Sequence, residues 1–321
     1  MKIYITREIP EKGIDKLKAK GYEVNVNPED RILTKEELIT SLKGQNYDAL
    51  FCLLTDKIDG EVMDSFGPQL KVVANMAMGF DNINVDEAKK RGIMVTNTPD
   101  VLTNTVAEHT FALMLAIAHR IPEADKFMRA LKYENWAPML FLGNDLSGKT
   151  LGIVGLGRIG SRVAYHALKG FDMKVVYYDV KRNEDFEKNF SAVYMPLEDL
   201  LKQSDFISIH VPLFDSTHHL INAENLKLMK PSSYLVNTSR GPVIDEAALA
   251  FALANKIIKG AALDVFEFEP KITPELLQLD NVILTPHIAS ATEETRSKMS
   301  VLAATNIIEA LEGRIPSNLV K

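Results

Sequence analysis

Short runs of apolar and β-branched residues alternate with helical patterns along the whole 321-residue chain. Alternation of this kind is typical of α/β proteins, in which helices cover the faces of parallel sheets. One set of strand-like runs lies within residues 1–97 and a second within residues 150–285. Since a chain of this length usually forms two domains, the pattern predicts an α/β fold with two parallel sheets.

Helical patterns separate the strand-like runs in both sets. We expect helices at Glu11–Lys20, Lys35–Leu42, Val85–Arg91, Arg158–Lys169, Leu197–Lys202, Ala223–Met229, Asp245–Ala254 and Glu293–Leu311. The segment 104–120 is apolar nearly all round, so we expect a helix buried against a domain junction or a second subunit. Thr105 and Glu108 fit a capping box at the start of this helix.

The composition excludes several classes of protein. The net charge of −6 leaves no basic footprint for nucleic acid. The apolar run Phe111–Ala118 is shorter than the roughly 18 residues that cross a bilayer, and the first ten residues lack the apolar core of a secretory signal. Cys52, the single cysteine, lies in an apolar run and is predicted to be a small buried hydrophobe. These features favour a cytoplasmic protein without a membrane or nucleic-acid partner.

The hexapeptide GLGRIG, residues 155–160, follows an apolar strand-like run and begins a helical pattern. In this context the three glycines predict a dinucleotide site: Gly155 forms a tight turn, Gly157 admits a pyrophosphate, and Gly160 permits close packing of helix on strand. The start of the helix offers N–H groups to the phosphates. Arg158 adds a cation within the same loop.

Asp179 ends the next strand-like run, 19 residues after Gly160. A carboxylate at this place accepts hydrogen bonds from the ribose hydroxyls of NAD and repels the 2′-phosphate of NADP. Lys181 and Arg182 could accommodate that phosphate if Asp179 turned away. The sequence therefore favours NAD and leaves NADP possible.

Six stretches together make the chain resemble the D-isomer-specific 2-hydroxyacid dehydrogenase family over essentially its whole length. They are NMAMGFDNINVDEA (75–88), TNTVAEH (103–109), GLGRIG (155–160), NTSRGPVID (237–245), ALDVFEFEP (262–270) and LTPHIAS (284–290). The stretch WAPMLFLGNDLSGKT (136–150) is most similar to the glyoxylate and hydroxypyruvate reductase branch.

The resemblance implies two Rossmann-like, doubly wound parallel-sheet domains, with the cofactor domain inserted into the substrate domain. The expected flavodoxin-like substrate domain comprises residues 1–100 and 288–321, and the expected NAD(P)-binding Rossmann domain comprises 101–287. The family is usually dimeric, with a long apolar helix in the subunit contact, and 104–120 would be that helix. The segment from Trp136 could reach a neighbouring subunit's pocket.

Three residues match the catalytic positions of the family. Arg240 follows a strand-like run, and its guanidinium can bind a carboxylate and polarise the adjacent carbonyl. His287 is the expected proton donor, because histidine titrates near neutral pH. Glu269, directly before Pro270, is expected to bond to this imidazole and favour its charged form.

The resemblance also implies a set of binding residues. Substrate contacts are expected from Met78, Gly79, Arg240 and His287. Cofactor contacts are expected from Thr105, Gly155, Gly157, Arg158, Ile159, Gly160, Asp179, Val211, Pro212, Thr238, Ser239, Asp264, His287 and Ser290. No metal is expected in the reaction.

The stretch LDVFEFEP carries three acids that need different explanations. Asp264 matches the family position that contacts the nicotinamide amide, whereas Glu267 has no role in the family pattern and is expected to face solvent. For these acids to lie in such different surroundings, the chain must leave extended geometry after Val265. Among the remaining histidines, His218 and His219 lie in a polar stretch and are expected to be solvated.

The expected activity is reduction of glyoxylate or hydroxypyruvate to the D-2-hydroxy acid, with hydride from NAD(P)H. D-Lactate, 3-phosphoglycerate and formate dehydrogenases share this chemistry. The short segment after His287 argues against the phosphoglycerate enzymes that carry a regulatory domain, and the lack of an extended N-terminal segment argues against the formate enzymes. The small apolar loop MAMGF suits a compact substrate such as glyoxylate or hydroxypyruvate, whereas lactate remains open. A non-enzymatic NAD-sensing corepressor on the same fold is the alternative from another class.

Overall fold

Two compact units make up the protein, and the computed structural model describes residues 1–320. Unit 1 comprises Met1–Leu102 and the chain from Ala291 onward, and unit 2 comprises Thr103–Ser290. The sequence-based breaks were placed at residues 100 and 288. Each unit contains one parallel sheet with helices on both faces, so the prediction of an α/β fold with two doubly wound sheets is confirmed.

Unit 1 is built on a five-stranded parallel sheet in the order β2-β1-β3-β4-β5, the flavodoxin-like order. Its strands are β1 (Lys2–Ile5), β2 (Glu23–Val26), β3 (Ala49–Cys52), β4 (Val72–Asn75) and β5 (Met94–Thr96). Its helices are α1 (Glu11–Lys18), α2 (Lys35–Leu42), α3 (Gly60–Ser65), α4 (Val85–Lys90) and α12 (Glu293–Leu311).

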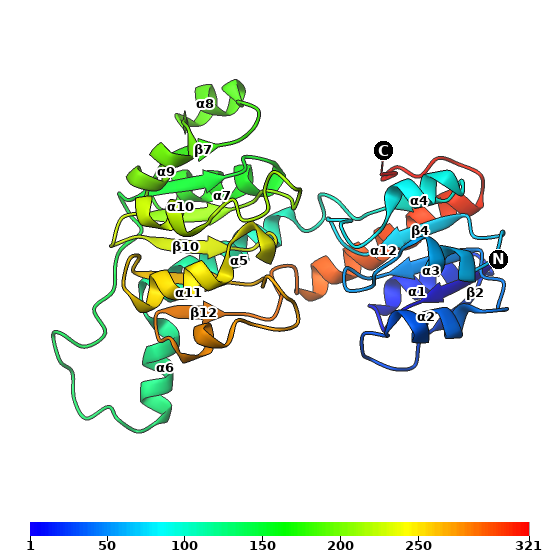
Figure 1. Ribbon diagram of the computed structural model, residues 1–321, viewed down its shortest axis with the longest axis horizontal. Coiled ribbons are helices and arrows are strands. Elements are labelled where there is room, and N and C mark those ends of the chain that lie inside the picture. The colour runs from blue at the N-terminus through cyan, green and yellow to red at the C-terminus, as the bar shows by residue number, and fades with distance from the viewer. Residues whose placement is uncertain (321) are drawn as a thin grey trace. The chain divides into compact units, whose positions relative to one another are not determined.

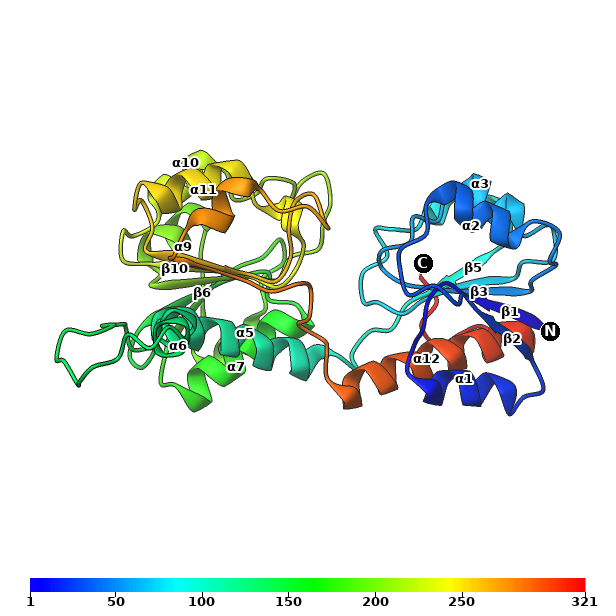
Figure 2. The same cartoon turned by 90° about the horizontal axis from the view of Figure 1, so that it is seen from below.

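The helices of unit 1 bury both faces of its sheet. α1 and α12 pack together on one face, while α2, α3 and α4 share an apolar cluster with the strands on the other (Figure 2). β3 and β4 are buried along their whole length, as continuous apolar runs in parallel sheets are. Cys52 lies in this core, as predicted, with its side chain fully buried.

Unit 2 contains a seven-stranded parallel sheet in the order β12-β11-β10-β9-β6-β7-β8, in which β6 to β12 follow the Rossmann pattern. Its strands are β6 (Thr150–Val154), β7 (Lys174–Tyr178), β8 (Val193–Tyr194), β9 (Phe206–Ile209), β10 (Tyr234–Asn237), β11 (Gly260–Leu263) and β12 (Val282–Leu284). Its helices are α5 (Thr103–Ala118), α6 (Ile121–Arg129), α7 (Arg158–Gly170), α8 (Glu184–Phe190), α9 (Leu197–Gln203), α10 (Ala223–Leu228) and α11 (Glu246–Ala254), with 3₁₀ turns at Gly241–Val243 and Pro274–Gln278.

The two faces of this sheet carry separate apolar clusters. One joins the strands to α5 and α7, and the other joins them to α9, α10 and α11 (Figure 2). Four helices or strands of the structure, α3, α6, α8 and β8, were not expected from the sequence. Three of them, α3, α8 and β8, span seven residues or fewer, and so short an element gives a weak periodic signal.

The long apolar helix differs from expectation in two respects. α5 begins at Thr103, so Thr105 lies inside its first turn and the proposed capping box is wrong. Leu102, directly before the helix, is buried. The sheet and α7 of unit 2 bury the apolar surface of α5, so its composition requires no second subunit.

Among residues 1–320, no helix combines the length and apolar character that crossing a bilayer requires.

Candidate active site

The strands of unit 2 are in register at their carboxyl ends. Val154 of β6 pairs with Tyr178 of β7 and with Ile209 of β9. The pairing continues from Ile209 to Asn237, then to Leu263 and Leu284. The loops that follow six strands therefore begin at one edge of the sheet, where open α/β folds bind ligands. All the predicted cofactor-binding residues except Thr105 of α5 lie on these loops or at the start of α7.

The glycine loop connects β6 to α7. A Cβ on Gly160 would lie 2.0 Å from the carbonyl oxygen of Gly155, so only glycine permits this turn. A Cβ on Gly157 would meet nothing within 4 Å, and this open side has room for a phosphate. α7 begins at Arg158, and its first N–H groups face the end of the loop. The loop thus fits the pyrophosphate of a dinucleotide.

Asp179 joins the glycine loop to the loop after β7. Its Oδ2 accepts a hydrogen bond of 2.7 Å from the backbone N–H of Leu156, and its Oδ1 accepts one of 3.2 Å from Lys181. The carboxylate therefore braces the glycine loop from the side on which a ribose would follow the phosphates.

The strand order reverses between β6 and β9, which makes this the switch point of the sheet. A Cβ on Gly155 would lie within 3 Å of His210 and of the Val211 side chain, so the two loops touch there. His210 is bonded to Ser208 over 2.8 Å, and burial lowers its pKa to about 3. A histidine that stays neutral is suited to binding and not to proton donation.

A network of side chains holds the turn that carries Arg240. Asn237, the buried last residue of β10, donates to the Arg240 carbonyl over 2.9 Å and accepts from both the N–H and the hydroxyl of Ser239. The hydroxyl of Thr238 lies 3.1 Å from that of Thr110 on α5. These bonds fix the backbone from which the Arg240 guanidinium projects.

Gly241 brings this turn against the stretch that carries Glu269. A Cβ on Gly241 would lie within 2.4 Å of the backbone of Phe266 and Glu267, so only glycine fits between the two segments. β11 ends at Leu263, and the chain bends at Asp264 and Val265. The predicted departure from extended geometry is present and begins slightly earlier than expected.

Glu269 and His287 form a pair. The Nδ1 of His287 lies 3.1 Å from one carboxylate oxygen of Glu269, and the other oxygen accepts from the N–H of Phe266 over 3.0 Å. Both side chains are partly exposed, so a ligand can reach them. Burial alone would raise the pKa of Glu269, but the hydrogen bond and charge of His287, with a contribution from Arg240, lower it overall. The carboxylate is thus held in its ionised form.

Asp264 clamps the segment that carries His287. Its carboxylate is fully buried and accepts hydrogen bonds from the Thr285 hydroxyl (2.6 Å) and from the N–H groups of Ile288 (2.9 Å) and Ala289 (2.7 Å). His287 itself has φ of +53°, a strained conformation that neighbouring bonds must maintain. Burial raises the pKa of Asp264, but the bonds from His109 on α5, from Thr285 and from the two N–H groups lower it overall.

Glu267 does not face solvent, so this expectation is wrong. Its side chain is only 10% exposed, and one oxygen lies 2.7 Å from the Nε2 of His219. The other oxygen accepts from the N–H of Glu246 over 3.1 Å, while the buried Glu246 carboxylate accepts from the N–H groups of Glu267 (2.7 Å) and Thr273 (2.8 Å). The two glutamates bridge the start of α11 and the stretch leading to Glu269. The bond also shows that His219, unlike the exposed His218, is not simply solvated.

Met78 and Gly79 belong to the loop after β4 in unit 1. The carbonyl of Met78 accepts from the Asn97 amide over 2.7 Å, and that of Gly79 accepts from the Asn75 amide over 2.9 Å. Asn75 also bonds to Asn82, whose own amide donates to the carbonyls of Leu53 and Asp56. The carbonyls of Met78 and Gly79 are thus both hydrogen-bonded to side-chain amides.

Several of these positions were missed by sequence reasoning. Asn237, Glu246 and Thr285 hold the backbone around Arg240, Glu269 and His287. A buried polar residue at the end of a parallel strand, or at the start of a helix, was the available signal for Asn237 and Glu246. The partners of the Glu246 carboxylate lie 21 and 27 residues away in the chain, so no local pattern identifies its role.

Comparisons with known proteins agree with this geometry. Residues 111–289 match the family described as D-isomer specific 2-hydroxyacid dehydrogenase, NAD binding domain. A glyoxylate reductase from Korarchaeum cryptofilum is 51% identical over 99% of this chain and 95% of its own length.

Solved structures extend the likeness to the whole fold. The TT0316 protein from Thermus thermophilus superposes with a TM-score of 0.94 at 41% identity, covering 100% of both chains. An NADPH-dependent glyoxylate/hydroxypyruvate reductase from Sinorhizobium meliloti, solved with NADP and malonate, gives a TM-score of 0.86 at 32% identity, covering 99% of this chain and 96% of that one. This chain belongs to the D-isomer specific 2-hydroxyacid dehydrogenase family and is an oxidoreductase with an NAD-binding domain.

Proposed function

We propose that this enzyme reduces a small 2-oxo acid, glyoxylate to glycolate or hydroxypyruvate to the D-2-hydroxy acid. The observation that carries the proposal is the Glu269–His287 pair, with the charge of Arg240 acting on it, at the sheet edge that holds the glycine loop. The reductases of Korarchaeum and Sinorhizobium support the choice of substrate. In this scheme unit 2 holds the cofactor and also carries Arg240, Glu269 and His287.

Each residue has a distinct task. NAD(P)H, when bound, supplies the hydride. Arg240 binds the substrate carboxylate and polarises the neighbouring carbonyl. Because the Nδ1 of His287 faces Glu269, its Nε2 is the atom that delivers the proton to the carbonyl oxygen. Glu269, ionised, orients the ring and stabilises the imidazolium that donates.

In unit 1, the loop at Met78 and Gly79 is suited to binding a carboxylate. Since Asn97 and Asn75 occupy its carbonyls, the loop is fixed in a shape that can present backbone N–H groups to an anion. The small side chains around it suit a compact substrate.

The cofactor of choice is NAD(H). The Asp179 carboxylate, fixed on the N–H of Leu156, would repel a 2′-phosphate. The remaining cofactor contacts would come from Thr105, Val211, Pro212, Thr238, Ser239 and Ser290. Asp264 would contact the nicotinamide amide through an oxygen lone pair that its own hydrogen bonds do not use. Steady-state rates with NADH and NADPH under the same conditions test the preference, and higher kcat/KM with NADPH would contradict it.

The substrate is tested by following NADH oxidation with glyoxylate, hydroxypyruvate, pyruvate and 3-phosphohydroxypyruvate. We expect the highest kcat/KM with one of the first two. A preference for pyruvate or for the phosphorylated acid would replace the proposed substrate while keeping the chemistry. No turnover with any of the four would overturn the proposed function.

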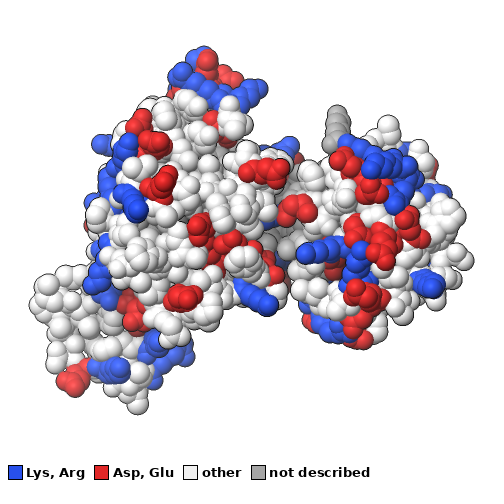
Figure 3. All heavy atoms as spheres, in the orientation of Figure 1, with Lys and Arg blue, Asp and Glu red and all other residues white. Residues whose placement is uncertain are grey.

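The enzyme is proposed to be a homodimer that uses the segment around α6. Large apolar side chains are exposed there, among them Leu131 (91%), Trp136 (77%) and Met139 (75%). In Figure 3 the projection formed by α6 and the segment after it is mostly white, with few charged side chains. An apolar patch of this kind marks an association surface. Light scattering should give a dimer mass, which Trp136→Asp should shift toward the monomer.

The cytoplasm is the proposed location. The one cysteine, Cys52, is buried and forms no disulfide, which suits a reducing compartment.

A further inference from the structure

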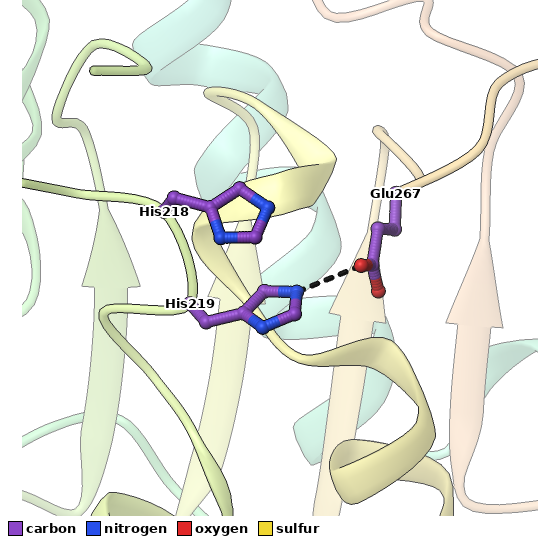
Figure 4. Close-up of side chains that lie close together, drawn as sticks. All are labelled: His218, His219 and Glu267. Atoms are coloured by element: carbon purple, nitrogen blue, oxygen red, sulfur yellow. Dashed lines mark hydrogen bonds and ion pairs between the residues drawn. The ribbon is translucent and has the colours of Figure 1, made fainter. Parts of the chain in front are cut away.

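Two histidines and a glutamate lie close together in unit 2 (Figure 4). His218 and His219 lie in the segment between β9 and α10, and Glu267 lies in the bend after β11. One ligand atom from each of the three side chains lies within 4.8 Å of the other two. The imidazole rings stack with centroids 4.0 Å apart, and the Glu267 carboxylate faces the Nε2 of His219.

Two of the three side chains start from fixed backbone. The N–H of His219 donates to the carbonyl of Pro242 over 2.9 Å. The N–H of Glu267 donates to the Glu246 carboxylate over 2.7 Å, and one Glu267 oxygen accepts from the N–H of Glu246. This leaves the other oxygen directed at His219. Partners that orient a ligand in this way are typical of metal sites, because they lower the cost of assembling the ligands.

The chemistry of the three groups selects one class of ion. Two imidazole nitrogens and one carboxylate oxygen suit Zn²⁺ and its neighbours Co²⁺ and Ni²⁺. Mg²⁺ and Ca²⁺ prefer sets made only of oxygen. Because His218 is exposed, water can complete the coordination on that side.

Binding such an ion requires a small shift of His219 and Glu267 and a rotation of the His218 ring. Bonds of roughly 2.0–2.2 Å to a tetrahedral ion place the ligand atoms about 3.3–3.5 Å apart. The 2.7 Å contact between His219 and Glu267 would open by well under 1 Å on this geometry. His218 would turn out of the stacked arrangement, which its exposure permits.

We propose that His218, His219 and Glu267 bind a divalent transition-metal ion of the zinc class, with water in the remaining position. The site shares none of the residues assigned to hydride or proton transfer. Metal binding is therefore measured without cofactor or substrate, and its outcome does not depend on the proposed activity.

The test uses the full chain after treatment with a chelator. Titration with Zn²⁺ in a calorimeter should show one site per chain. With Co²⁺ in its place, visible absorption bands should report nitrogen and oxygen coordination of low symmetry. His218→Asn is the main variant, since a change at an exposed side chain leaves the fold intact, and it should weaken binding at least about tenfold.

A matched control and a second variant make the test decisive. His119 is a separate exposed histidine at the end of α5, so His119→Asn should bind as the unaltered protein does. Glu267→Gln should also weaken binding, with circular dichroism confirming that it is folded. Equal affinity in the unaltered protein and in His218→Asn would overturn the proposal. Absence of saturable binding tighter than about 1 mM would overturn it as well.

Discussion

The carboxyl edges of the two sheets are stabilised by different chemistry. In unit 1, the amides of Asn97 and Asn75 donate to the carbonyls of Met78 and Gly79, and the amide of Asn82 donates to the carbonyl of Asp56. In unit 2, carboxylates accept from backbone N–H groups, as Asp264 does from Ile288 and Ala289 and Glu269 does from Phe266. When side-chain amides donate to the carbonyls of a loop, the backbone N–H groups of that loop are left to bind an anion. A carboxylate places negative charge beside an imidazole, and this charge favours the protonated ring.

The same contrast appears in the two buried aspartates. Asp56, at the edge of unit 1, bonds to the Thr6 hydroxyl and the Leu53 N–H, yet burial dominates and raises its pKa. Asp264 is buried too, but its several donors lower its pKa overall. Burial alone therefore does not decide the charge of a carboxyl group; the number of donors aimed at it does.

The largest effect is expected when the proton donor of unit 2 is removed. His287→Asn should lower kcat by about 10²- to 10⁴-fold, because the carbonyl oxygen loses its acid. Binding of NADH should change little, and NADH fluorescence titration checks this. His119→Asn serves as a control for replacing a histidine. A kcat within tenfold of the unaltered enzyme would remove His287 from this role.

Paired substitutions test the difference between the aspartates. Asp264→Asn should lower the free energy of unfolding at pH 7 by about 2–4 kcal/mol, since an amide cannot accept from all of the donors. Asp56→Asn should cost about 1 kcal/mol or less, because that site already favours the uncharged form. Urea denaturation gives both values, and equal losses would contradict the distinction.

The pH dependence of the same pair follows from the directions of the pKa shifts. The pKa of Asp264 is lowered on folding, so its stabilisation is present above the unfolded value near ~3.9 and is lost as pH falls through the folded pKa. The pKa of Asp56 is raised, so its contribution is present in acid and is lost as pH rises through the folded pKa. Unfolding curves from pH 3 to 7 should therefore be less acid-sensitive in Asp264→Asn and more so in Asp56→Asn.

Replacing Glu269 removes the negative charge beside His287 and so tests the role of this carboxylate. Glu269→Gln should reduce kcat about 10- to 100-fold, the value of one charged hydrogen bond. The alkaline limb of the rate profile should move to lower pH, because a neutral amide no longer favours the imidazolium. An unchanged profile would assign Glu269 to structure alone.

The smallest effect is expected in unit 1. Asn97→Ala frees the Met78 carbonyl and should raise KM for the 2-oxo acid about two- to tenfold with little change in kcat. Asn281→Ala, which removes bonds to the Leu253 and Lys259 carbonyls, is the matched control. A fall in kcat with KM unchanged would show that this loop acts in the chemical step and not in substrate binding. That result would contradict the proposed difference between the two sheet edges.

The sequence by itself determined the alternation of most strands and helices and the glycine loop. These features follow from short-range periodicity and from backbone demands that a few adjacent residues express. It also placed Arg240, Glu269 and His287 at strand ends, because parallel strands bring their carboxyl ends to one edge.

Only the tertiary structure decided the contacts of Asp264 and Glu267, the other two acids of LDVFEFEP. Glu267 is held by His219, 48 residues earlier, and Asp264 holds Thr285, 21 residues later. The burial of α5 depends in the same way on β10 and α7, which lie far from it in the chain. Hydrogen bonds and packing between distant segments leave no local pattern, and for that reason three acids that looked alike in LDVFEFEP acquire three different tasks.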